Sequence, residues 1–214
     1  MRCVRAVAVA TGLFVAIGAS AADEPMLAPG SGPPPEALSE EIRSVLNPDG
    51  LTVTLASGDT MEFWFLAETP SGESGRGGAT FPELGVGTLV GAVRTSATWS
   101  DYKGNRIEPD VFTLRYGMRP EDGNHMGVSV HLDFVLLVPA AEDAAVEAGW
   151  GQDDLNIMSF AATGLGHPGV MSLAPNWESP TEPVLFQDDA GGWAVAWVWD
   201  GLTLGFVVEG EGEH

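Results

Sequence analysis

The strongest constraint on the fold is a two-residue turn near the end of the chain. Asp200-Gly201 separates two segments, 193–199 and 202–208, in which bulky apolar residues alternate with smaller ones. Both positions of such a turn need a positive φ angle, which Asp and Gly tolerate, so the pair predicts a β-hairpin. In the register that this turn sets, Trp193 lies opposite Val208 and all the bulky side chains share one face.

The two faces of this hairpin predict different roles. The bulky face carries three tryptophans beside aliphatic partners, and exposing it would leave a larger apolar patch than soluble monomers tolerate. We therefore expect this face in the core, with a sugar-stacking platform made by these tryptophans, Trp64 or Trp99 as the alternative. The opposite face is small and flat, so Ala194, Ala196 and Gly205 are candidates for contact with a partner.

The same two-residue alternation recurs along most of the chain, and clusters of Gly, Pro, Asn and Asp separate the segments. It predicts nine strands: Leu51–Leu55, Met61–Leu66, Gly87–Thr95, Val111–Met118, Asp133–Val138, Val170–Leu173, Val184–Gln187, Trp193–Trp199 and Leu202–Val208. Residues 134–138 are apolar at every position, which indicates a strand covered on both faces.

Helical spacing of apolar residues predicts a short N-terminal helix within 36–47 and one or two short helices in a connection near 140–162. Helices do not alternate with strands, which disfavours a parallel α/β fold. We therefore expect a mainly β protein, a single antiparallel β-sandwich with a barrel as the alternative.

The first residues have the pattern of a secretory signal. Arg2 and Arg5 precede an apolar run, and Ala19-Ser20-Ala21 is a small-residue cleavage pattern. The apolar run is shorter than a membrane span, and we expect no transmembrane segment once the leader is removed. We therefore predict a secreted or periplasmic protein, cleaved near Ala21/Ala22. The predicted segments are a signal peptide (1–21), a flexible Pro/Gly-rich linker (22–35), a single β-sandwich domain (36–208) and an acidic tail (209–214).

Charge and cysteine content exclude several functions. The chain has 30 acidic and 9 basic residues and a formal net charge of −21, and Arg2 and Arg5 belong to the predicted leader. Binding of nucleic acid needs a basic face that displaces counterions, so we expect no nucleic-acid partner. The single cysteine, Cys3, also lies in the leader. The mature chain would then have no disulfide, thiolate metal site or cysteine nucleophile.

Metal binding is the most specific chemistry that the histidines allow. Asp122, His125, His131 and Asp133 lie close together in the sequence, and Met126 could add a thioether ligand for copper. Their spacing matches no diagnostic metal motif such as H-E-x-x-H. We therefore predict no cofactor, and keep a copper or other divalent ion at Asp122, His125, His131 and Asp133 as an alternative.

Four segments near the middle of the chain follow one another in a distinctive order: WSDYKG (99–104), VFTLRY (111–116), EDGNHMGVS (121–129) and DFVLLVP (133–139). Their order resembles a group of uncharacterised secreted bacterial β-sandwich proteins with no established activity, over about forty residues. The resemblance implies no catalytic role. It implies that the polar loop with Asp122, Asn124, His125, Met126 and Ser129 is the best position for a binding site.

No catalytic arrangement stands out in the sequence. It contains neither a G-x-S-x-G nucleophile elbow nor a phosphate-binding G-K-[ST], and its acids are too numerous to single out a catalytic pair. We therefore expect an exported, non-catalytic binding or accessory protein of the bacterial cell envelope, whose partner is an envelope protein or a small ligand. The alternatives are a periplasmic metal-binding protein that uses His125 and His131, and a carbohydrate-binding module.

Overall fold

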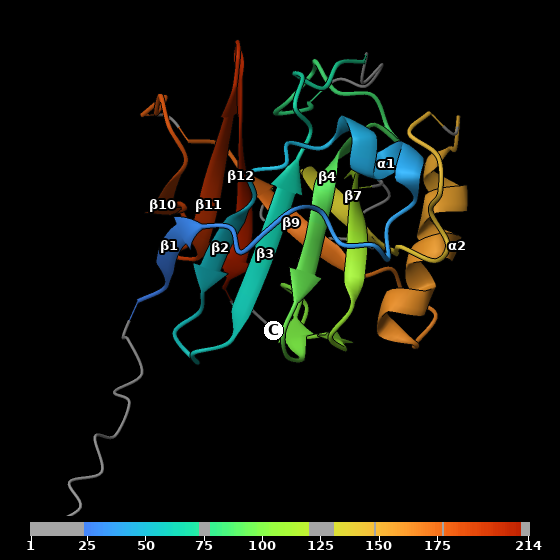
Figure 1. Ribbon diagram of the computed structural model, residues 1–214, viewed down its shortest axis with the longest axis horizontal. Coiled ribbons are helices and arrows are strands. Elements are labelled where there is room, and N and C mark those ends of the chain that lie inside the picture. The colour runs from blue at the N-terminus through green and yellow to red at the C-terminus, as the bar shows by residue number, and fades with distance from the viewer. Residues whose placement is uncertain (1–23, 73–77, 120–130, 148, 177, 211–214) are drawn as a thin grey trace, which may run out of the picture.

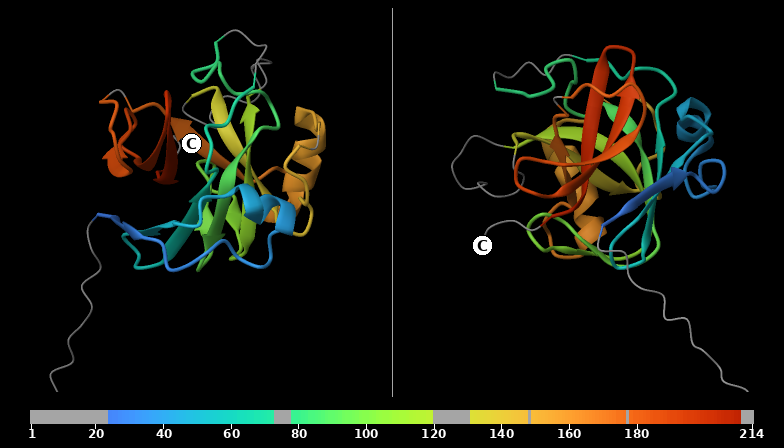
Figure 2. Two further views of the ribbon diagram at one scale, coloured as in Figure 1. Left: turned by 45° about the horizontal axis from the view of Figure 1, so that its top comes forward. Right: turned by 90° about the vertical axis from the view of Figure 1, so that its left-hand side faces the viewer.

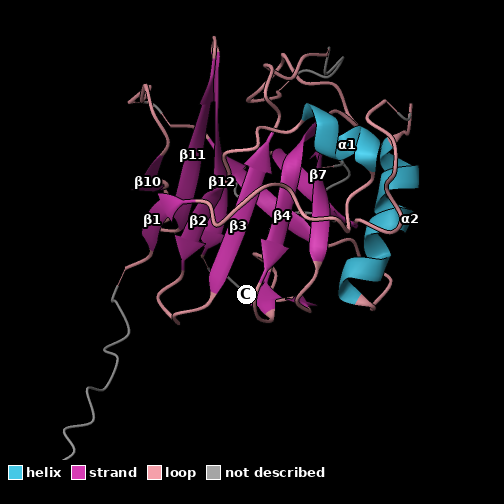
Figure 3. Ribbon diagram, viewed as in Figure 1, coloured by secondary structure: helices cyan, strands magenta, loops and turns pink. Residues whose placement is uncertain are grey.

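The computed structural model describes residues 24–72, 78–119, 131–147, 149–176 and 178–210 (Figure 1). Strands dominate this part of the chain, and two helices accompany them (Figure 3). The elements are β1 (Met26–Pro29), α1 (Glu40–Val45), β2 (Leu51–Thr54), β3 (Thr60–Phe65), β4 (Leu89–Thr95), β5 (Trp99–Ser100), β6 (Arg106–Ile107), β7 (Val111–Met118), β8 (Asp133–Pro139), α2 (Gln152–Thr163), β9 (Val170–Ala174), β10 (Val184–Gln187), β11 (Trp193–Trp199) and β12 (Leu202–Glu209).

Ten strands form one antiparallel sheet, in the order β1-β2-β3-β4-β7-β8-β9-β12-β11-β10, and β5 and β6 form a small separate hairpin. The sheet curls until its two edge strands, β1 and β10, lie close together, so it is nearly closed into a barrel (Figure 2). The predicted mainly β, antiparallel fold is confirmed. Because one sheet runs from β1 to β10, the barrel alternative describes it better than two separate layers do.

The nine predicted strands are all present, with ends that differ by one or two residues, and β1 is the tenth strand of the large sheet. β1 lies in the segment that the sequence predicts as a flexible linker, and it pairs along β2. Beyond β1, the Gly30 amide donates to the Gly50 carbonyl at 2.7 Å, and Trp64 Nε1 donates to the Gly32 carbonyl at 2.9 Å. The structure corrects the linker prediction here, because distant strands supply bonds that local composition cannot reveal.

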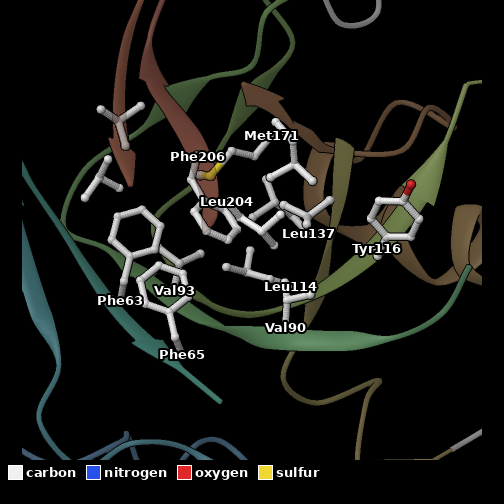
Figure 4. Packing of buried hydrophobic residues seen from close by; sticks show 14 of the residues in the cluster. Phe63, Phe65, Val90, Val93, Leu114, Tyr116, Leu137, Met171, Leu204 and Phe206 are labelled. Carbon is white, nitrogen blue, oxygen red and sulfur yellow. The ribbon is translucent and has the colours of Figure 1, made fainter. Parts of the chain in front are cut away.

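Aromatic and aliphatic side chains fill the inside of the barrel (Figure 4). Phe65 is one of them, and its ring centroid lies 4.8 Å from that of Phe206 and 4.9 Å from that of Trp197. Offset and tilted rings at such distances stabilise a core beyond the area they bury. The barrel interior around these rings is therefore packed with side chains.

The β11–β12 hairpin shows the predicted register over most of its length, and Trp199 pairs with Leu202 and Trp197 with Leu204. Its bulky face contributes to the barrel core, as expected. At the far end, however, Trp193 pairs with Glu209 and not with Val208, because the register shifts between Trp193 and Ala194. A bulge adds one residue to a strand, and alternation alone does not reveal its position.

Both helices cover the outer face of the sheet (Figure 2). Under α1 lie Trp64 and Ala92, and under α2 lie Phe134, Leu136 and Val138 of β8. The alternate β8 residues Val135 and Leu137 point into the barrel core, which confirms that β8 is covered on both faces. Among the described residues, neither helix has the length and apolar content needed to span a membrane.

Candidate functional site

A cleft of about 560 Å³ lies at the end of the sheet where β3 ends and β4 begins. Three chain segments enclose it together with the last turn of α1: residues 66–71, residues 86–89, and residues 146, 147, 149 and 150 of the connection between β8 and α2. None of these segments is adjacent to the next in sequence. The cleft therefore depends on the fold, which brings the end of β3 and the beginning of β4 together and places helix α1 beside them.

A buried ion pair is bonded to two walls of the cleft. Arg115 of β7 and Asp143 have exposed side-chain fractions of 1% and 0%, and Arg115 donates from Nε to Oδ2 at 2.8 Å and from Nη2 to Oδ1 at 2.9 Å. Arg115 Nη1 also donates to the carbonyls of Gly87 at 3.0 Å and Val146 at 2.9 Å. Because one rigid guanidinium bonds both walls, their separation is fixed.

The Arg115 guanidinium also positions the indole of Trp150, which lines the cleft. Its central carbon lies 5.1 Å from the centroid of the Trp150 ring, a distance typical of a cation–π contact. Gly87 lies close to the same residue and has a φ angle of +92°, and a Cβ there would be 2.8 Å from the Trp150 carbonyl oxygen. A side chain at position 87 would therefore push Trp150 out of place.

Helix α1 is bonded to the connection between β8 and α2 as well. Its capping residue Ser39 donates from Oγ to the Ala144 carbonyl at 2.7 Å, and the Val146 amide donates to Glu41 Oε1 at 2.8 Å. Ser39 also accepts a hydrogen bond from the Ile42 amide at 3.1 Å, which caps the helix. The helix and the connection therefore form one bonded unit on the side of the cleft.

The lining combines apolar side chains with polar groups. Val45, Leu66, Leu89 and Trp150 give apolar surface, and the exposed glutamates Glu68 and Glu147 give carboxylates. Hydroxyl groups come from Ser44, Thr69, Ser71 and Thr88. Such a lining can hold a small ligand by burial of its apolar part and by hydrogen bonds that fix its orientation.

The predicted polar-loop site lies mostly outside the described residues. This applies to Asp122, Asn124, His125, Met126 and Ser129, so that part of the prediction stays a prediction. The two other predicted metal ligands are described: His131 is half-buried and Asp133 is fully buried. Within the described ranges, no three His, Cys, Asp or Glu side chains are grouped so that they could hold a metal ion.

Asp133 has a structural role at the end of β8. Its carboxylate accepts hydrogen bonds from the amides of Thr80 at 2.8 Å and Phe81 at 3.3 Å, and from the hydroxyl of Tyr116. Burial raises the pKa of Tyr116 far above its usual value, and the bond to the Asp133 carboxylate raises it further. These contacts join the turn before Phe81 to the barrel.

The flat face of the last hairpin is covered by the protein itself. Ala194, Ala196 and Gly205 are buried, and Phe186 of β10 packs against this face. A Cβ at Gly205 would lie 2.5 Å from the Phe186 ring. This corrects the prediction of a free docking surface: the small residues there make room for an aromatic side chain of the same chain.

The tryptophans proposed as a sugar platform have structural partners. Trp64 is 1% exposed, and Trp199 donates from Nε1 to the Leu66 carbonyl at 2.8 Å. Trp99 donates from Nε1 to the Val208 carbonyl at 2.8 Å. The prediction that the hairpin tryptophans belong to the core is therefore confirmed, since Trp193 and Trp197 pack against the same cluster.

Sequence reasoning missed the residues that build the cleft. Arg115 could have been noticed, because a cation inside the apolar strand 111–118 indicates a buried carboxylate partner. The sequence could not say which of its acids is that partner, since Asp143 lies 28 residues away. Trp150, Glu68 and Glu147 carry no local signal at all.

The chain matches no protein-family model, no curated protein and no solved structure. The resemblance of residues 99–139 to secreted bacterial proteins therefore stays a prediction.

Proposed function

We propose that this protein is an exported, non-catalytic binding protein of the bacterial cell envelope that holds a small ligand in the cleft beside α1. The observation that carries the proposal is the cleft itself. Its volume of about 560 Å³ is in the range of sites that bind small molecules, and its lining has the usual mixture of apolar walls and a few polar groups.

The hydrogen bonds that hold the walls in place support a role of the cleft in binding. Arg115 bonds Gly87 and Val146 at the same time, and α1 bonds the connection at Ala144 and Val146. A ligand that enters such a site does not have to order its walls, so less of the binding free energy is lost on association.

A small ligand is also favoured over the protein partner that the hairpin face suggested. Ala196 and Gly205 are buried, and Phe186 of β10 packs against this face of the hairpin. Export rests on the predicted signal peptide of residues 1–21.

The test is a ligand screen against a variant with a blocked cleft. Ala67 is exposed and lines the cleft, so Ala67→Trp places an indole in the cleft without replacing a buried side chain. Ala190→Trp is the matched control, because Ala190 is an exposed residue of the turn between β10 and β11. A library of small amines, alcohols, sugars and carboxylic acids is screened by ligand-observed NMR on the mature chain.

We expect compounds that bind the wild-type protein and Ala190→Trp but not Ala67→Trp. Compounds that bind all three proteins equally, or a library without a single binder, would refute the proposed function.

A further inference from the structure

The charges around the cleft are of one sign. Glu68 and Glu147 are its charged side chains among the described lining residues, and both are exposed. An anionic ligand would therefore meet two carboxylates without a cation to pair with. A positively charged ligand would meet two carboxylates close to apolar walls.

Arg115 does not alter this sign, although it is bonded to two of the walls of the cleft. The guanidinium already donates hydrogen bonds within the protein. Asp143 accepts two of them, and three backbone carbonyls accept the others, those of Gly87, Val146 and Ala145. Its charge is balanced by the buried carboxylate. The whole chain, with a formal net charge of −21, adds a negative long-range field that attracts cations.

We propose that the cleft selects ligands with a positively charged nitrogen on an apolar body. This inference rests on the proposed function and specifies its ligand class. The apolar body lies against Val45, Leu66 and Trp150, and the charged nitrogen lies toward Glu68 and Glu147 at the open side. The carboxylates thus give selectivity, and the apolar walls contribute most of the affinity.

The test compares three probes that share one body and differ in charge: 4-phenylbutylammonium, 4-phenylbutanol and 4-phenylbutyrate. Dissociation constants are measured by NMR titration at low salt for the wild-type protein and for Glu68→Gln/Glu147→Gln. The matched control is Glu178→Gln/Glu182→Gln, which removes the same charge from exposed positions in the loop before β10.

We expect the ammonium probe to bind about tenfold more tightly than the alcohol, on the order of what two exposed ion pairs contribute, and the carboxylate to bind most weakly. Glu68→Gln/Glu147→Gln should bring the ammonium probe to the affinity of the alcohol and leave the alcohol unchanged. The control variant should keep the preference, and added salt should reduce it.

Two results would overturn the inference. Equal affinities of the three probes for the wild-type protein would show that the carboxylates do not select charge. If Ala67→Trp still abolished that binding, the proposed function would stand although the cation preference would not. Absence of binding by the ammonium probe would also overturn the cation preference, and the wider library then decides the proposed function separately.

Discussion

Asp143 has a small side chain, but we expect its removal to destabilise this protein strongly. Its carboxylate is fully buried and accepts hydrogen bonds from Thr113 Oγ1 at 2.5 Å and from two nitrogens of Arg115. Asp143→Ala leaves the Arg115 charge buried without its carboxylate partner. Breaking one side of a buried pair costs about 3–5 kcal/mol, and we expect a loss of unfolding free energy in that range.

The double variant Arg115→Met/Asp143→Leu separates the charge effect from the loss of packing. It removes both charges and keeps most of the volume, so it should lose less stability than Asp143→Ala alone. It will not recover fully, because the carbonyls of Gly87 and Val146 lose their donor. Urea unfolding followed by circular dichroism gives the free energies, provided that the slopes agree.

A surface ion pair is the control for this experiment. Arg106 and Glu108 lie 3.7 Å apart with side chains 71% and 73% exposed, so Glu108→Ala should leave the urea midpoint within experimental error. If Asp143→Ala unfolds at the wild-type urea concentration, or if the double variant is less stable than Asp143→Ala, the buried Arg115 charge does not carry the expected cost.

Three other predictions concern packing and pH. Gly205→Ala should lower the unfolding free energy by about 1–3 kcal/mol in urea titrations, because its Cβ would lie 2.5 Å from the Phe186 ring; unchanged stability contradicts the packing there. Burial raises the pKa of Asp101, so ionisation of this carboxyl costs stability as pH rises. The unfolding temperature of Asp101→Asn should therefore rise relative to that of the wild type from pH 4 to pH 7. Burial also acts to raise the pKa of Glu62, but hydrogen bonds from Ser31 and Arg94 outweigh it, and the pKa is lowered. The loss of unfolding free energy caused by Glu62→Gln at neutral pH should therefore become smaller as pH falls. A loss that does not change with pH contradicts the lowered pKa of Glu62.

Much of the barrel could be predicted because its strands follow local rules. Alternation along the chain marks most of the strands, a continuous apolar run marks β8, and the Asp200-Gly201 turn sets the register of the last hairpin. β1 could not be predicted in this way, because Met26–Pro29 has little apolar alternation and is held by pairing with β2. The flat hairpin face was misread for a related reason, since the Phe186 that covers it comes from another strand.

The site was less predictable than the fold. Its cleft depends on contacts between residues that are far apart in sequence, such as Arg115 with Asp143 and α1 with Val146. A chain with 30 acidic residues offers too many partners for one buried arginine, so pairing could not be assigned without the fold. The predicted polar loop around His125 lies outside the described residues, and its role stays a prediction.

We propose the cleft beside α1 as a preformed site for a cationic ligand. A crystal structure of the mature protein soaked with 4-phenylbutylammonium tests it most directly. We predict the phenyl ring against Trp150, the nitrogen near Glu68 or Glu147, and the Arg115–Asp143 pair intact below. A cleft filled by the protein's own side chains, or a probe bound elsewhere with the cleft open, would contradict this prediction.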